Sequence, residues 1–253
     1  MTGTARRFEG KVAIVTGAAK GMGRQVSLDF AREGARIVGS DIDASGLAQL
    51  TADIEAMGAQ CETVTCDVAS RAQVEAMIAA AMRRFGRVDI LINNAGLLLT
   101  GTIEETTDEI IERTLDINVK GILYAIRAVT PIMKAQRYGR IVNVSSITGK
   151  NGDNTTFFVY GASKGAVISL TRSVARQLGP FGVTTNAVAP HAIMTGMMSY
   201  WDDEKKKSIS DKIPVRRLGT VEDVSALMRF LASDEASFIN GETVNINGGY
   251  YMD

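Results

Sequence analysis

Short hydrophobic runs alternate along this chain with longer segments in which apolar residues recur every three or four positions. The short runs are rich in aliphatic and β-branched residues, as expected for buried strands; they are 11–16, 35–40, 60–66, 88–92, 140–145, 183–189 and 242–246. Helical spacing covers the segments between them, namely 23–33, 44–57, 71–85, 110–135 and 161–178. This alternation predicts consecutive βαβ units.

Such units, joined by right-handed crossovers, build a doubly wound parallel sheet. The pattern therefore predicts an α/β fold of the Rossmann type with about seven strands. In this fold the ligand crevice opens at the carboxyl ends of the strands. Residues that directly follow a predicted strand are therefore the first candidates for function.

The 253 residues contain no repeat or low-complexity tract and only four prolines. Since α/β folds of this length commonly form one domain, we expect a single domain over 1–253. The stretch 195–214 combines methionines and aromatic residues with a run of charged residues. We interpret it as a partly helical substrate lid; the alternative is that its apolar side chains simply pack on the body of the protein.

Charge and hydropathy indicate a small-molecule partner. Lysine plus arginine and aspartate plus glutamate number 28 each, so no net charge draws the molecule to nucleic acid or to an anionic membrane. The first ten residues are polar and do not resemble a signal peptide. No apolar run approaches the ~20 residues of a membrane span. We therefore expect a cytoplasmic protein.

Metal ligands are scarce in this sequence. Its only cysteines are Cys61 and Cys66, and its only histidine is His191. A tetrahedral zinc site lacks a plausible ligand set, so we expect no metal. The placement of both cysteines on one predicted strand and its exit disfavours a disulfide.

A glycine-rich turn follows the first predicted strand and opens the first predicted helix. It runs from Thr16 to Gly23 with the spacing G-x-x-x-G-x-G, which departs from the common G-x-G-x-x-G fingerprint. Bare backbone can approach a phosphate there, and the helix amides face its negative charge. We predict a dinucleotide site whose residues in this turn are Gly17, Lys20, Gly21, Met22 and Gly23.

Asp41 ends the second predicted strand, twenty positions beyond Gly21. Its carboxylate can accept hydrogen bonds from both hydroxyls of an adenosine ribose, whereas a 2′-phosphate would meet like charge. Lys20 and Arg36 would only partly offset that repulsion. The sequence thus favours NAD over NADP, with helix capping as the alternative role of Asp41.

Tyr160 and Lys164 are four residues apart, so on a helix they share one face. A free tyrosine titrates near ~10, but a nearby ammonium and an oxidised nicotinamide both favour the phenolate. Tyr160 can then serve as general acid or base. Lys164 would lower the pKa of the tyrosine and hold the nicotinamide ribose.

Ser146 stands at the end of the fifth predicted strand, where its hydroxyl can hydrogen-bond a substrate oxygen as charge develops. Ser145 is the alternative for this role. A serine-hydrolase interpretation has little support, because the chain has one histidine and no G-x-S-x-G elbow. Each of these residues alone also has a structural explanation, such as a loop cap or an exposed helical pair.

Taken together and in order, these motifs resemble the short-chain dehydrogenase/reductase family in its shorter, one-domain branch. The resemblance covers nearly the whole chain and includes Asn93-Asn-Ala-Gly96, Tyr160-Gly-Ala-Ser-Lys164 and Asn186-Ala-Val-Ala-Pro190. It implies that Asp67 and Val68 border the adenine. It further implies an NAD site made of Gly17, Lys20, Gly21, Met22, Gly23, Asp41, Asp67, Val68, Asn94, Ala95, Gly96, Tyr160, Lys164, Pro190, Ile193 and Thr195, with Asn94 at the neighbouring ribose region and Ile193 and Thr195 at the carboxamide.

The same resemblance supplies the fourth catalytic residue and an assembly. Asn118 matches the family asparagine that holds water on a proton path to the lysine, which completes a tetrad of Asn118, Ser146, Tyr160 and Lys164. The resemblance also implies a homo-oligomer, with four copies as the family-based expectation. Its candidate interfaces are the helical segments 110–135 and 161–178 and the residues 248–251.

Two departures from the family pattern bear on the substrate. The segment from Ser146 to Tyr160 is one residue longer than usual, and His191 follows Pro190 where the family commonly has glycine. His191 could reshape the substrate pocket or contact the cofactor; the alternative is a structural loop histidine. Candidate substrate walls are mainly apolar and comprise Leu97, Leu98, Leu99, Asn151, Phe157, Phe158, His191, Met197, Met198 and Trp201.

We therefore expect an NAD-preferring oxidoreductase that interconverts a secondary alcohol and a ketone, with a medium-sized substrate that has an apolar portion. Within enzymes, a 3-oxoacyl thioester reductase is the alternative. An enoyl reductase is disfavoured because the tyrosine and lysine are usually farther apart in that related group. Outside enzymes, the alternative is a catalytically silent nucleotide-binding sensor or scaffold, against which the complete tetrad argues.

Overall fold

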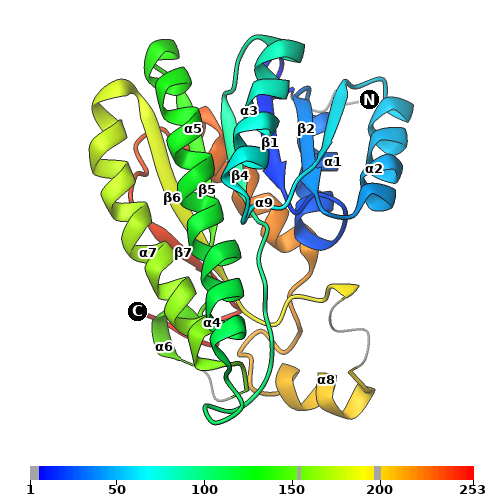
Figure 1. The fold of residues 1–253 in the computed structure, drawn as a ribbon. Helices are drawn as coiled ribbons and strands as arrows, with labels where there is room; N and C mark the ends of the chain where they lie inside the picture. The colour runs from blue at the N-terminus through cyan, green and yellow to red at the C-terminus, as the bar shows by residue number, and fades with distance from the viewer. Residues whose placement is uncertain (1–5, 153–154, 197–200) are drawn as a thin grey trace.

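The computed structural model describes residues 6–152, 155–196 and 201–253. Within these residues, seven parallel strands form one sheet in the order β3-β2-β1-β4-β5-β6-β7 (Figure 1). Their bounds are β1 (Val12–Thr16), β2 (Arg36–Asp41), β3 (Cys61–Thr65), β4 (Ile90–Asn93), β5 (Gly139–Val144), β6 (Val183–Pro190) and β7 (Thr243–Ile246). The strand order reverses between β1 and β4, which confirms the predicted doubly wound sheet and places its switch point there.

Helices cover both faces of the sheet (Figure 1). Alternation along β1 points Ala13 and Val15 to one face and Val12 and Ile14 to the other, so each face has its own apolar core. The first core is covered by α1 (Gly21–Arg32), α2 (Ala44–Ala56) and α9 (Val221–Ala232), and the second by α3 (Arg71–Phe85), α5 (Gly121–Gln136) and α7 (Phe158–Leu178).

Shorter helices follow strands at their carboxyl ends, namely α4 (Asp108–Leu115), the π-helical turn η1 (Asp116–Lys120), α6 (Thr148–Asn151) and α8 (Asp203–Ser210). The 3-10 turns η2 (Gly179–Phe181) and η4 (Asp234–Ala236) lie at the opposite edge, where η2 leads into β6 and Asp234 bonds Arg140 at the start of β5. The helical segment predicted over 110–135 is confirmed, since α4, η1 and α5 follow one another without a gap, but the π-helical turn η1 within it was not predicted. A single wider turn of this kind is typical of functional sites.

Two other helices differ from the expectation. Helix α7 begins at Phe158, three residues before the predicted start. Helix α9 was not delimited from hydrophobic spacing, although its capping box is visible in the sequence: the Thr220 side chain accepts from the backbone N–H of Asp223, and the Asp223 side chain accepts from that of Thr220.

The stretch 195–214 contains α8, so the expectation that it is partly helical is confirmed. Its role as a lid stays a prediction, and Met197 and Met198 lie outside the described residues. Cys61 and Cys66 are both buried thiols. Among the residues that the structure describes, no helix has the length and apolar character needed to cross a membrane.

A buried carboxylate joins the beginnings of β1 and β4. Asp89 is fully buried and accepts hydrogen bonds from the Val12 backbone N–H at 2.9 Å and from Arg87 Nε and Nη2 at 2.7 and 2.6 Å. Both carboxylate oxygens are thus engaged, which offsets the cost of burying the charge. Removing this carboxylate would leave the amide and the guanidinium without their partner.

We expect Asp89→Ala to lower the free energy of unfolding by about 1–3 kcal/mol, the usual cost of leaving a buried hydrogen-bonding group, here the Val12 N–H, without its partner. Urea unfolding followed by circular dichroism measures this. Glu75→Ala is the matched control, because Glu75 forms an exposed pair with Arg71, and such pairs add little to stability. Equal losses of stability in Asp89→Ala and Glu75→Ala would contradict the stabilising role of the buried Asp89 carboxylate.

Candidate active site

The turn between β1 and α1 brings bare backbone to the switch point of the sheet. Gly17 and Gly21 have φ values of +67° and +57°, which favour glycine. A Cβ at Gly23 would collide with the carbonyl oxygen of Gly17, so only glycine fits there. Asn94, just beyond β4, donates from Nδ2 to the carbonyls of Thr16 and Gly17, each at 3.0 Å. The strand tips β1 and β4 are therefore fastened together where a dinucleotide is expected.

Asp41 lies beside this turn at the end of β2. Its carboxylate accepts from the backbone N–H groups of Ala19 at 3.0 Å and Asp43 at 3.1 Å. The N-cap of α2 is Asp43, whose side chain accepts from the Gly46 N–H. The alternative that Asp41 caps this helix is therefore wrong, and its negative charge is held next to the glycine turn.

The expected adenine edge includes a contact that sequence spacing does not reveal. The Asp67 carboxylate accepts from Arg113 Nη2 at 2.9 Å and from the Ala69 N–H at 3.0 Å. Val68 packs closely on Gly121, where a Cβ would lie 3.0 Å from the valine side chain. Arg113 comes from α4, so the helical segment that follows β4 holds a residue expected at the adenine.

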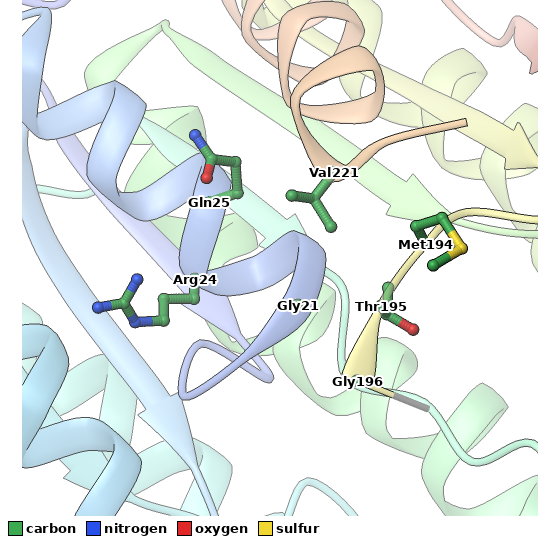
Figure 2. Close-up of a pocket in the computed structure, with 7 residues that line it drawn as sticks. All are labelled: Gly21, Arg24, Gln25, Met194, Thr195, Gly196 and Val221. Atoms are coloured by element: carbon green, nitrogen blue, oxygen red, sulfur yellow. The ribbon is translucent and has the colours of Figure 1, made fainter. Parts of the chain in front are cut away.

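A hollow separates the start of α1 from the loop after β6 (Figure 2). It has a volume of about 390 Å³ and is lined by Gly21, Arg24, Gln25, Met194, Thr195, Gly196 and Val221. The structure thus brings Gly21 and Thr195, two predicted cofactor residues, to the same hollow. Ile193 pairs with Gly219 just before α9, and Met194 N–H donates to the Gly219 carbonyl at 2.8 Å, which fixes this loop.

Helix α7 presents Tyr160 and Lys164 on its buried side. Lys164 Nζ donates to the Val144 carbonyl at 2.8 Å and lies 5.8 Å from the centre of the Tyr160 ring. Burial lowers the pKa of Lys164 to about 8, because desolvation penalises the ammonium. The lysine can therefore gain or lose a proton near neutral pH.

Asn118 sits in the π-helical turn η1 and is fully buried. Its Oδ1 accepts a hydrogen bond from the Leu97 N–H at 2.7 Å. Its Nδ2 donates to the Leu97 carbonyl at 2.9 Å and to Ser163 Oγ at 3.0 Å. Ser163 in turn donates to the Tyr160 carbonyl at 2.7 Å. Asn118 thereby ties the loop after β4 to the first turn of α7. Ser163, which motif spacing did not single out, is the residue that makes this link.

Asn118 and Lys164 meet at one glycine. A Cβ at Gly96 would lie 3.4 Å from both Asn118 Oδ1 and Lys164 Nζ, so the two polar atoms face the same small space. The structure thus brings three of the four tetrad residues, Asn118, Tyr160 and Lys164, around the start of α7.

The two serines after β5 have different partners. Ser145 Oγ donates to the Lys164 carbonyl at 2.8 Å, so its proton is used to hold α7. Ser146 Oγ instead accepts from the Thr148 N–H at 3.2 Å, a bond that leaves the hydroxyl proton to be donated to a ligand. These contacts favour Ser146 over Ser145 as the polarising group.

The predicted substrate walls are dispersed. Leu98 and Leu99 are partly exposed in the loop after β4, Asn151 is exposed at the end of α6, and Trp201 lies under Lys205 Nζ at 5.0 Å from its ring centre. Phe157 is buried. The ring of His191 stacks on Tyr250, with centres 4.0 Å apart and planes at 25°.

Phe158 lines a second hollow, and none of the four tetrad residues is among the residues that line it. This second hollow has a volume of about 200 Å³ and is lined by Thr148, Gly152, Thr156, Phe158, Gly161 and Ala162. Phe158 and Ala162 are four residues apart on α7 and so share a face that differs from that of Tyr160.

Comparisons with known proteins find similarity over almost the whole chain. A family model described as Enoyl-(Acyl carrier protein) reductase matches residues 17–251. The 3-oxoacyl-acyl-carrier-protein reductase FabG of Thermotoga maritima is 35% identical over 243 residues, covering 96% of this chain and 98% of its own. Galactitol 2-dehydrogenase of Agrobacterium fabrum is 36% identical over 258 residues, covering 97% and 99%. The crystal structure of levodione reductase matches with a TM-score of 0.89 and 34% identity, covering 96% of this chain and 98% of its own.

The low pKa of Lys164 has a measurable consequence for stability. Between about pH 8 and the ordinary value of 10.5, the unfolded chain binds more protons than the folded chain, so stability rises with pH in that window. We expect Lys164→Met to gain stability relative to the parent protein at pH 7 and to lose most of that gain by pH 10. Urea unfolding of the cofactor-free proteins at both pH values measures the difference.

Lys212→Met, at an exposed lysine, is the control and should show no such pH-dependent difference. A stability difference between Lys164→Met and the parent that stays constant from pH 7 to pH 10 would contradict the lowered pKa.

Proposed function

Since the chain belongs to the short-chain dehydrogenase/reductase family, we propose that it interconverts a secondary alcohol and a ketone with NAD, using Tyr160 as the general acid/base. The observation that carries this proposal is the placement of Tyr160 and Lys164 on one buried face of α7, beside the exits of β4 and β5. The chain is thus an NAD(P)-dependent oxidoreductase rather than a silent scaffold; the preference for NAD and the residue roles are our proposal.

The residues at the switch point fit a dinucleotide. A cradle that a Cβ at Gly23 would fill and the amino end of α1 suit a pyrophosphate. The Asp41 carboxylate, held by two backbone N–H groups, suits the hydroxyls of the adenosine ribose. Asp67 and Val68 would border the adenine, and Ile193 and Thr195 would hold the carboxamide. Hydride exchange with a carbon of the substrate is the chemistry that a bound nicotinamide supplies.

The chain's own residues handle the proton and the substrate oxygen. In the oxidative direction, Tyr160 Oη takes the hydroxyl proton of the alcohol; in the reductive direction it returns that proton to the carbonyl oxygen. Ser146 donates a hydrogen bond to the same oxygen as its charge changes. The Lys164 ammonium favours the phenolate form of Tyr160. Asn118 holds the loop after β4 and faces the same space as Lys164 Nζ, which suits a water between them.

The substrate is proposed to have an apolar portion. Leu98 and Leu99 expose apolar surface in the loop after β4. The hydrogen bonds of Asn118 to Leu97 and Ser163 hold this loop against α7. The names of the relatives include a 3-oxoacyl reductase and a galactitol dehydrogenase, so thioesters and polyols both belong in a substrate panel. The four-residue spacing of Tyr160 and Lys164 supports carbonyl chemistry over reduction of a C=C bond.

Removal of the phenol should abolish turnover. We expect Tyr160→Phe to lower kcat by about 10²–10⁴-fold, the usual contribution of general acid–base catalysis, a loss much larger than any change in the dissociation constant for NAD. Reduced-nicotinamide absorbance with a panel of secondary alcohols measures the rate, and calorimetry measures binding. Tyr124→Phe on α5 is the matched control; comparable rates for Tyr160→Phe and Tyr124→Phe would refute the assignment.

The charge of Asp41 should set the choice of cofactor. Like charges about 4 Å apart near a protein surface repel by about 4 kcal/mol, so we expect Asp41→Ala to shift the ratio of kcat/KM for NADP to that for NAD upward by at least about tenfold. Glu55→Ala, an exposed acid on α2, should leave the ratio unchanged. Equal use of NAD and NADP by the parent protein would overturn the proposed preference.

A further inference from the structure

Residues 247–253, which we call the C-terminal segment, fold back on themselves after β7. Asn247 organises this turn: its Nδ2 donates to the Tyr251 carbonyl at 2.7 Å and its Oδ1 accepts from the Gly249 N–H at 2.9 Å. Gly248 and Gly249 have φ values of +63° and +85°, which the turn requires. The segment ends beside α6 (Figure 1).

The first contact of the C-terminal segment reaches the loop after β6. Tyr250 stacks on His191, with ring centres 4.0 Å apart. His191 directly follows Pro190, whose carbonyl accepts from the Ile147 N–H at 3.2 Å, and Ile147 directly follows Ser146. The stack therefore lies next to the hydrogen bond that joins the exits of β5 and β6, where the polarising serine is proposed.

The second contact reaches the loop after β5. Lys150 Nζ donates to the Asp253 carboxylate at 2.5 Å and to the Thr243 carbonyl at 3.2 Å, and Asn245 Nδ2 donates to the other Asp253 oxygen at 2.6 Å. The Lys150 side chain is only 10% exposed, so this ion pair is partly shielded from water. Because Lys150 belongs to α6, the pair ties the loop that carries Ser146 to the C-terminal segment.

The third contact reaches the end of the stretch 195–214. Val215 N–H donates to the Gly248 carbonyl at 3.2 Å. A Cβ at Gly248 would lie 2.6 Å from the side chains of both Ile213 and Val215, so the segment lies directly against them. The C-terminal segment thus contacts three parts of the chain at the carboxyl ends of the strands: the loop after β6, α6 after β5, and residues 213–215.

The exposure of the C-terminal segment argues that these contacts do more than add to the core. Tyr250 is 40% exposed and Met252 is 79% exposed, so neither belongs to an apolar core. Ala192, directly after His191, has φ +47°, a conformation that a non-glycine residue keeps only when its neighbours enforce it. The stack with Tyr250 holds His191, the residue before Ala192, and the pairing with Gly219 holds Ile193, the residue after it.

We propose that Tyr250 is a positioning residue for the substrate side of the site, acting through the ring of His191. This inference rests on the proposed function. It assigns His191 a role in shaping the substrate pocket through its ring partner, a pairing formed by residues 59 positions apart in the sequence.

Steady-state kinetics of Tyr250→Ala and Tyr250→Phe test the proposal, with an alcohol that the parent protein oxidises. We expect Tyr250→Ala to raise KM for the alcohol about three- to tenfold, the range that corresponds to one aromatic pair, while the dissociation constant for NAD stays within about twofold. Tyr250→Phe keeps the ring and should behave like the parent. Met252→Ala, in the same segment, is the matched control.

A double-mutant cycle with His191→Ala separates positioning from general destabilisation. If Tyr250 acts through His191, the double variant should have the same KM as either single variant, because the interaction is lost once. Additive increases, or an unchanged KM in Tyr250→Ala, would overturn the inference and leave the proposed function intact. Absence of turnover by the parent protein with every alcohol and ketone of the panel would overturn the proposed function, and this inference with it.

Should Tyr250→Ala fail to fold, His191→Ala and Tyr250→Leu provide the same comparison. A further readout comes from the single histidine of the tag-free protein. Its imidazole NMR signal should shift in Tyr250→Leu and should shift again when the alcohol is added to the Tyr160→Phe protein saturated with NAD. A signal that is insensitive to both changes would count against the proposed position of His191.

Discussion

The packing of α7 against the carboxyl end of β5 is the constraint on which the candidate site depends. This one helix carries Tyr160 and Lys164, so its position sets where the proposed proton-transferring groups lie. Two hydrogen bonds hold it to the end of β5, from Ser145 to the Lys164 carbonyl and from Lys164 Nζ to the Val144 carbonyl. Gly149 lets the following loop approach the same backbone, since a Cβ there would lie 2.6 Å from the Lys164 carbonyl carbon.

This packing has an electrostatic consequence. Burial of Lys164 makes its charge costly, yet the proposed chemistry uses that charge to favour the phenolate of Tyr160. The ammonium that burial disfavours is therefore the same charge that the proposed mechanism requires. Sites that shift a pKa in this way commonly reduce stability in exchange for reactivity. The surrounding contacts of Asn118 and Ser163 keep the helix in place despite that cost.

Sequence spacing predicted the features that depend on neighbours in the chain. Strands buried on both faces appear as continuous apolar runs, so their predicted bounds differ from the observed ones by only one or two residues. The four-residue spacing of Tyr160 and Lys164 likewise needed no tertiary information. The π-helical turn at Asn118 was missed because it depends on side-chain hydrogen bonds to Leu97 and Ser163, which hydrophobic periodicity does not register. The contacts of Arg113 with Asp67 and of Tyr250 with His191 were missed because the partners are distant in sequence.

The proposed function depends on direct transfer of a hydride between the carbon of a secondary alcohol and a nicotinamide. Its most direct test uses NAD and a panel of secondary alcohols that carry deuterium on the carbinol carbon, with mass spectrometry of the reduced dinucleotide. We expect one deuterium in each reduced dinucleotide formed from a substrate of the panel. Reduced dinucleotide without the label, with the deuterium released to water, would contradict direct hydride transfer.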